Sequence, residues 1–209
     1  MKAKDIEHNL ELLGQELAIR GILDPIRVLL VGGAYMLTQL KVRRTTDDVD
    51  VYPLDEQWQP KTGGIPLPQI LQEVADEIEV RYHLPEHWFN SKIAGFLSGA
   101  AEMPDIVLWR SFGPLEVYLP PNEYILALKL LANRVKDLQD IRTLFRKLRI
   151  RTRQQAQQLI DFYISDKEVQ FFCGVHLHLN DHFEVESGKM KKVQKNKEKD
   201  SISNGNKDT

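Results

Sequence analysis

The sequence has little that would place the protein in a membrane or an oxidising compartment. Its 209 residues include a single cysteine, Cys173, so no disulfide can form within the chain and a reducing compartment is expected. No apolar run approaches the roughly 20 residues that cross a bilayer, and the first ten residues lack a hydrophobic signal core. These absences predict a cytoplasmic protein with no membrane partner.

An excess of charge of one sign is also missing. The chain has 28 Lys and Arg residues against 30 Asp and Glu residues, a formal net charge of −2. This balance argues against a protein whose main task is to coat nucleic acid, although it leaves room for a local basic patch. The length suits one domain, with or without a small appendage.

An ordered pattern of strand, glycine and acid stands in the first quarter of the chain. It begins with the apolar run Ile26–Val31, long enough for a buried strand, which Gly32 and Gly33 end. A short helical segment follows, and then a second strand in which Asp48 and Asp50 alternate with valines. Because residues two apart in a strand point to the same side, the two carboxylates are expected to project together.

The two acids and the glycines predict a site for a metal ion and a phosphate. Adjacent carboxylates repel each other unless a cation lies between them, and Mg²⁺ takes one or two carboxylates together with water and substrate phosphates. The N–H groups of Gly32 and Gly33, at the start of a helix, can approach a phosphate closely. The alternative is that Asp48 and Asp50 are exposed acids on an edge strand and that the glycines only make a tight turn.

This pattern resembles the signature of the nucleotidyltransferase superfamily, in which a strand ending in Gly-Gly or Gly-Ser precedes a short helix and Asp-apolar-Asp. The segment Arg44–Asp50 resembles Arg-x-Thr-x-Asp-apolar-Asp, found in the bacterial branch associated with toxin–antitoxin and abortive-infection systems. A second segment, Leu119–Ile141, resembles the Lys-x-x-Ala…Arg-x-x-Asp-x-x-Asp helix of that branch. The residues of this second match are Lys129, Ala132, Arg134, Asp137 and Asp140. Together the two matches cover about two-thirds of the chain.

The resemblance implies an α/β fold with a small mixed sheet of four or five strands flanked by helices, followed by a helical C-terminal portion. It implies an enzyme that holds an NTP with two Mg²⁺ ions and transfers an NMP to a hydroxyl. The acceptor would be tRNA or a protein, and a cognate toxin or antitoxin protein would be a partner. The alternative is a degenerate member that binds nucleotide or partner without chemistry.

The resemblance also implies three catalytic carboxylates. Asp48 and Asp50 would hold the metal, and Glu116 is our candidate for the third because it stands inside an apolar strand. Asp105, at the start of the preceding strand, is the other option. Glu116 is equally compatible with the polar face of a half-exposed strand.

Nucleotide binding is expected, again by resemblance, from Gly32, Gly33, Arg44, Thr46 and Lys129. Each of the last three has a structural alternative that the sequence leaves open. Arg44 can pair with a nearby aspartate, Thr46 can cap the turn before the acids, and a lone Lys129 on an apolar helix can be a surface residue. The acids and arginine downstream of Lys129 are expected to form mainly a charge network between two helices.

The remaining pattern predicts the order of elements. Apolar periodicity predicts helices over 5–20, 67–82, 122–134, 136–148 and 152–164, and short apolar runs predict strands over 105–109 and 115–119. We therefore divide the chain into a nucleotidyltransferase-like core over 1–120, a helical portion over 121–183 and a Lys-rich tail over 184–209, expected to be disordered.

Overall fold

The structure is a computed structural model that describes residues 1–42, 44–55, 67–92 and 101–183. The expected tail lies outside these residues, as does most of the proline-containing stretch between the second strand and the helix that begins at Gln69. The strands are β1 (Ile26–Leu30), β2 (Val49–Pro53), β3 (Phe89–Asn90), β4 (Val107–Phe112) and β5 (Leu115–Leu119). The helices are α1 (Ala3–Ile19), α2 (Gly32–Gln39), α3 (Gln69–Tyr82), α5 (Asn122–Ala132), the 3₁₀ turn η1 (Val135–Asp137), α6 (Leu138–Leu148), α7 (Arg153–Tyr163) and α8 (Lys167–Phe172). A last helical stretch spans 175–183.

The five strands form one mixed sheet in the order β3-β2-β1-β5-β4. The central strand β1 pairs antiparallel with β2 and parallel with β5. The edge strands complete the sheet, because β3 runs parallel to β2 and β4 runs antiparallel to β5. Because β1 and β2 are antiparallel, the end of β1 and the start of β2 lie together at the same end of these two strands. The short helix α2 begins there.

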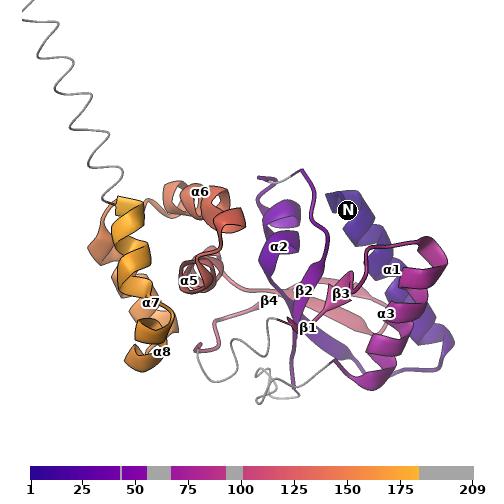
Figure 1. Ribbon diagram of the computed structural model, residues 1–209. Coiled ribbons are helices and arrows are strands. Elements are labelled where there is room, and N and C mark those ends of the chain that lie inside the picture. The colour runs from indigo at the N-terminus through magenta and orange to yellow at the C-terminus, as the bar shows by residue number, and fades with distance from the viewer. Residues whose placement is uncertain (43, 56–66, 93–100, 184–209) are drawn as a thin grey trace, which may run out of the picture.

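Helices α1 and α3 pack side by side on the sheet (Figure 1). The periodic apolar side chains of α1 are fully buried: Ile6, Leu10, Leu13 and Leu17. Gly14 allows the helix to lie directly against β4, because a Cβ at this position would come within 1.9 Å of the carbonyl oxygen of Phe112. The apolar face predicted from the sequence is therefore the face that joins α1 to the sheet.

Helices α5 to α8 gather as a second group beyond the sheet (Figure 1). α5 packs against both α6 and α7 and is buried along most of its length, from Tyr124 to Leu131. The rings of Tyr124 and Tyr163 meet edge to face with centroids 5.4 Å apart. Helix α7 begins at a capping box in which the hydroxyl of Thr152 accepts from the N–H of Gln155.

The expected fold class is confirmed, since a five-stranded mixed sheet flanked by helices is followed by a helical portion. The expected helix boundary near residue 135 differs in one respect. α5 ends at Ala132 and Asn133 takes a left-handed conformation, with φ of 40°. The chain then makes the turn η1 before α6. Arg134, Lys136 and Asp137, at this turn, lie beside the start of β2.

Candidate functional site

The loop between β1 and α2 forms one wall of the site. Val31 donates its N–H to the carbonyl of Asp50 at 3.0 Å, which ties the end of β1 to the start of β2. Gly32 follows with φ of +66°, and a Cβ there would lie 2.5 Å from Oδ2 of Asp50. Two features therefore require glycine at this position: the left-handed backbone conformation, and the Asp50 carboxylate, which occupies the place of a Cβ.

A cavity of about 120 Å³, here named the acidic cavity, opens beside this loop. Its lining residues are Gly33, Thr45, Thr46, Asp47, Asp48, Asp50, Arg134, Lys136 and Asp137. Asp48 and Asp50 line it together, whereas Val49 and Val51 are buried in the core. The alternation of acid and valine thus separates a cavity face from a core face, as the strand period predicts.

The environment of Asp50 opposes ionisation. Burial, and to a smaller extent the nearby charge of Asp48, raise its pKa to about 6. Positive charge from Arg134 and Lys136 acts in the opposite direction. A proton, or a cation in the cavity, would reduce the unfavourable energy of a carboxylate that lies against the backbone and beside a second acid.

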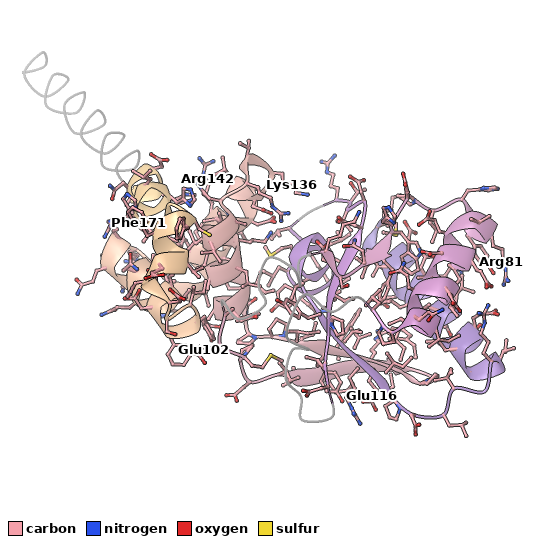
Figure 2. All side chains as sticks on the ribbon, turned by 60° about the horizontal axis from the view of Figure 1, so that its bottom comes forward. Arg81, Glu102, Glu116, Lys136, Arg142 and Phe171 are labelled. Atoms are coloured by element: carbon pink, nitrogen blue, oxygen red, sulfur yellow. The ribbon has the colours of Figure 1, made fainter. Side chains whose placement is uncertain are left out.

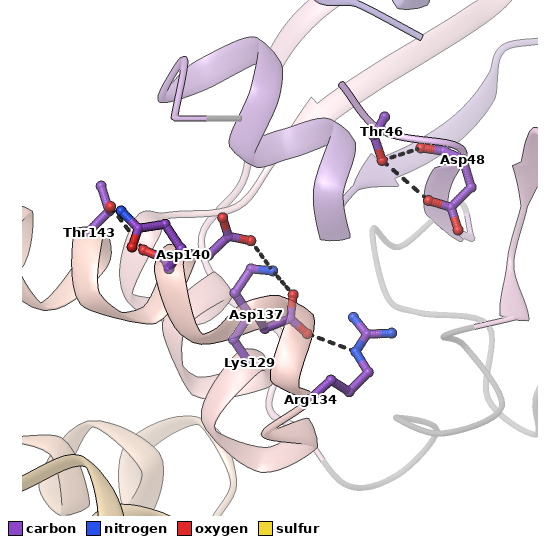
Figure 3. Close-up of polar contacts among 8 residues, drawn as sticks. Thr46, Asp48, Lys129, Arg134, Asp137, Asp140 and Thr143 are labelled. Atoms are coloured by element: carbon purple, nitrogen blue, oxygen red, sulfur yellow. Dashed lines mark hydrogen bonds and ion pairs between the residues drawn. The ribbon is translucent and has the colours of Figure 1, made fainter. Parts of the chain in front are cut away.

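The cationic wall of the cavity comes from the turn η1 and the residue before it. Arg134 and Lys136 are exposed residues that line the cavity with the two acids. Arg134 donates from Nε to Oδ2 of Asp137 at 2.7 Å (Figure 3). Burial alone would raise the pKa of Asp137, but Lys129 and Arg134 hold it below its ordinary value.

Lys129 does not face the cavity. Its side chain is 4% exposed, and Nζ lies 2.6 Å from Oδ1 of Asp137 and 2.8 Å from Oδ2 of Asp140. This buried network joins α5 to η1 and α6, as Figure 3 shows. The structural interpretation of the charge network is confirmed. The charge of the Lys129 ammonium group is balanced by two carboxylates of the protein, those of Asp137 and Asp140.

Thr46 and Arg44 take different places in the loop before β2. Thr46 is buried, and its hydroxyl lies within hydrogen-bond reach of the carbonyl of Asp48 at 3.2 Å and of Oδ1 of Asp48 at 3.4 Å. The side chain therefore fixes the turn that presents Asp48, which matches the capping role. Arg44 is exposed and is not among the residues that line the cavity. Within the described residues it forms no ion pair with Asp47 or Asp48.

The structure does not bring Glu116 to the acidic pair. Glu116 stands opposite Arg27 in the parallel pairing of β5 with β1, and the two side chains form an ion pair at 3.2 Å. The hydroxyl of Tyr118 also donates to Glu116 at 2.9 Å. Arg27 precedes Gly32 by five residues of extended chain, so Glu116 lies about 16 Å away along the strand. Pairing with Arg27 at the far end of the sheet explains why an acid occurs inside this apolar strand.

Asp105 does not take the place of Glu116. It is exposed, and its charge contributes to the raised pKa of Tyr163 in the helical group. Among the residues that the structure describes, no group of three or more His, Cys, Asp and Glu side chains is arranged to hold a metal ion. The acidic cavity thus offers a pair of carboxylates, Asp48 and Asp50, with Asp137 already engaged by two cations.

The donor set of the cavity fits Mg²⁺ bound together with phosphate. Two carboxylates supply the protein oxygens that this ion usually takes, and the remainder of its shell is water and substrate oxygen. A volume of about 120 Å³ corresponds to about four waters at bulk density. That space accommodates an ion and phosphate oxygens, and the sugar and base of a nucleotide would extend outside it.

The sequence interpretation missed Lys136 and did not select Arg134 as a binding residue. Arg134 is part of the Arg-x-x-Asp pattern, but its position in the cavity wall depends on the break between α5 and η1, which the pattern does not show. Lys136 carried no signal, because a single lysine in a polar turn is usually a surface residue.

Comparisons with protein-family models, with curated proteins and with solved structures find no match for this chain. No helix in the described parts of the chain is long and apolar enough to cross a membrane.

Proposed function

We propose that this chain is a Mg²⁺-dependent nucleotidyltransferase, which transfers an NMP from an NTP to a hydroxyl group of RNA, such as tRNA, or of a protein. The observation that carries the proposal is the position of the Asp50 carboxylate, against Gly32 at the start of α2 and beside Asp48. Metal ligands and phosphate-binding backbone groups would then meet in one cavity. The resemblance of the sequence adds a toxin–antitoxin context to this proposal.

The residues of the cavity have complementary tasks in this proposal. Asp48 and Asp50 would hold Mg²⁺, which when bound neutralises phosphate charge and favours an ionised attacking hydroxyl. The N–H groups at the start of α2 have no acceptor within the helix and would bind phosphate oxygens. Arg134 and Lys136 would contact the phosphates from the opposite wall, where Asp137 fixes the direction of the Arg134 side chain.

The proposed reaction is a displacement at the α-phosphorus. The acceptor oxygen forms a bond to this phosphorus while the bond from phosphorus to the bridging α,β-oxygen breaks. The acceptor loses its hydroxyl proton to water, and the electron pair of the broken bond leaves with pyrophosphate. The cavity residues contribute position and charge, which are the main contributions a protein makes to phosphoryl transfer.

A second candidate is a protein that binds Mg²⁺ and nucleotide but transfers nothing. Two observations favour it: Glu116 is paired with Arg27 far from the acids, and Lys129 is enclosed by Asp137 and Asp140. A site with the two carboxylates of Asp48 and Asp50 would retain metal and nucleotide binding. Its capacity to activate the acceptor would be lower than that of a three-carboxylate site.

A transfer assay separates the two candidates. The wild-type protein is incubated with each α-³²P-labelled NTP, Mg²⁺, and either total tRNA or total cell protein. Asp48→Asn and Asp50→Asn are compared with Asp76→Asn, an exposed aspartate of α3 whose carboxylate accepts from Gln72. We expect labelled RNA or protein with one nucleotide, reduced at least about 100-fold by either cavity variant and unchanged by Asp76→Asn.

Absence of transfer with all four nucleotides, while the wild type still binds one of them with Mg²⁺, would select the binding protein. Transfer that survives both cavity variants would exclude the acidic cavity as the active site.

A further inference from the structure

A second and larger hollow, here named the arginine groove, lies on the helical group. Its volume is about 680 Å³. The lining residues are Gln139, Arg142, Phe145, Arg146, Arg149, Ile150, Arg151 and Phe183. Figure 2 shows Arg142 on this group of helices, at the opposite end of the molecule from Arg81. The groove shares no residue with the acidic cavity.

Four arginines line the groove, and none of its described lining residues is acidic. Among the residues that the structure describes, no carboxylate pairs with the guanidinium of Arg142, Arg146, Arg149 or Arg151. Arg146 instead donates to neutral oxygens, the carbonyl of Arg142 at 3.4 Å and the hydroxyl of Thr143 at 3.3 Å. In a chain whose net charge is −2, a hollow with four cations is a strongly positive region. Anions are attracted to such a hollow.

The backbone concentrates these arginines. Arg142 and Arg146 are four residues apart in α6 and so share one face of the helix. Arg149 ends the helix in a left-handed conformation, with φ of 57°, and the chain turns so that Arg151 lines the same hollow. Glycine is the residue that normally takes this conformation after a helix. Arg149 is therefore not the residue that this backbone conformation favours, and its side chain adds a positive charge to the groove.

The lining also contains aromatic surface. The rings of Phe145 and Phe183 lie with centroids 5.2 Å apart and line the groove together with the arginines. Guanidinium groups bind phosphate oxygens in a bidentate way and stack on flat rings. Grooves that combine a positive track with aromatic side chains are typical of single-stranded nucleic-acid binding, because phosphates meet the charges and unpaired bases meet the rings.

We propose that the arginine groove is a binding site for single-stranded nucleic acid, distinct from the acidic cavity and independent of nucleotidyl transfer. Phosphates contact Arg142, Arg146, Arg149 and Arg151, and a base contacts the Phe145 and Phe183 surface. The shared chemistry is a phosphodiester strand with exposed bases, which RNA and DNA both provide. An acidic peptide offers the charge but has no bases for the aromatic surface.

Fluorescence anisotropy with a labelled 12-nucleotide RNA, the same DNA sequence, the RNA duplex and a poly-glutamate peptide tests this site. The titrations use the full chain without Mg²⁺ or NTP at several salt concentrations. Arg142→Gln/Arg146→Gln should weaken binding of the single strands at least about tenfold and lower the salt slope by about two. Phe145→Leu should weaken binding at an unchanged slope, and Arg81→Gln, with the same charge change outside the groove, should have no effect.

Arg149→Gly keeps the test valid if other variants fold poorly, because glycine fits the positive φ at this position. We expect this variant to melt at or above the wild-type temperature and to bind the strand more weakly. Equal binding of RNA and DNA, or a preference for either, supports the shared chemistry and identifies the source. No binding of either strand at low salt overturns the proposal. Poly-glutamate or duplex bound as tightly as the single strand also overturns it.

Discussion

At the scale of single residues, Asp50 is the centre of the acidic cavity. Its carboxylate lies against Gly32 on a backbone that only glycine adopts without strain, and its pKa is raised to about 6 by burial and by Asp48. Such a group destabilises the metal-free protein when it is ionised. The same features make a cation at this position favourable, so stability and binding are expected to oppose each other here.

This opposition predicts how unfolding depends on pH. The pKa of Asp50 is about 6 in the folded protein and about 3.9 in the unfolded chain. Its contribution to stability is therefore fully present below about pH 4 and is lost as pH rises through about 6. Asp50→Asn removes this loss and should raise the free energy of unfolding at pH 7.5, relative to wild type, by up to about 3 kcal/mol. At pH 4 it should give little gain.

Urea denaturation in EDTA at pH 4, 6 and 7.5 measures this difference, with Asp76→Asn as the control that should show no such trend. A stability difference between Asp50→Asn and wild type that stays constant across these pH values would contradict the assignment of the raised pKa to Asp50.

At the scale of elements, the break between α5 and α6 determines the cationic wall. Lys129 projects from α5 into a buried ion-pair network with Asp137 and Asp140, so η1 is held beside the start of β2. Arg134 and Lys136 then line the cavity from this turn. Lys129 serves the site by positioning other residues, whereas Lys136 has access to a ligand.

This division predicts that substitution of Lys129 mainly lowers stability, whereas substitution of Lys136 mainly weakens nucleotide binding. Lys129→Met leaves two buried carboxylates without their shared cation and should lower the free energy of unfolding by about 3–5 kcal/mol. Lys136→Met removes an exposed charge and should change stability by less than about 0.5 kcal/mol. It should nevertheless weaken binding of Mg²⁺-nucleotide by about tenfold.

Chemical denaturation and nucleotide titration of both variants give the two readouts. A Lys129→Met protein as stable as wild type, but with nucleotide affinity lost, would show instead that Lys129 contacts the ligand.

At the scale of the whole molecule, sequence pattern predicts the helices α1, α2, α3, α5, α6 and α7 and the strands β1, β2, β4 and β5, whereas the short elements β3 and α8 are not predicted. The apolar run before Gly32 and the alternation of Asp48 with Val49 each report a local geometry, so periodicity suffices. The partner of Glu116 depends on the register of β5 against β1, which no local pattern contains. The arginine groove was likewise not foreseen, because its charges converge only after α6 ends at a left-handed residue.

The central claim is that the acidic cavity binds Mg²⁺ and nucleotide together, and calorimetric titration tests it most directly. The full chain is titrated with the α,β-methylene analogue of each NTP, which the proposed reaction does not cleave. We predict one-to-one binding of at least one analogue with Mg²⁺, weakened at least about tenfold by EDTA, Asp48→Asn or Asp50→Asn and unchanged by Asp76→Asn. Binding that the two cavity variants leave unaltered, or no binding of any analogue, would contradict it.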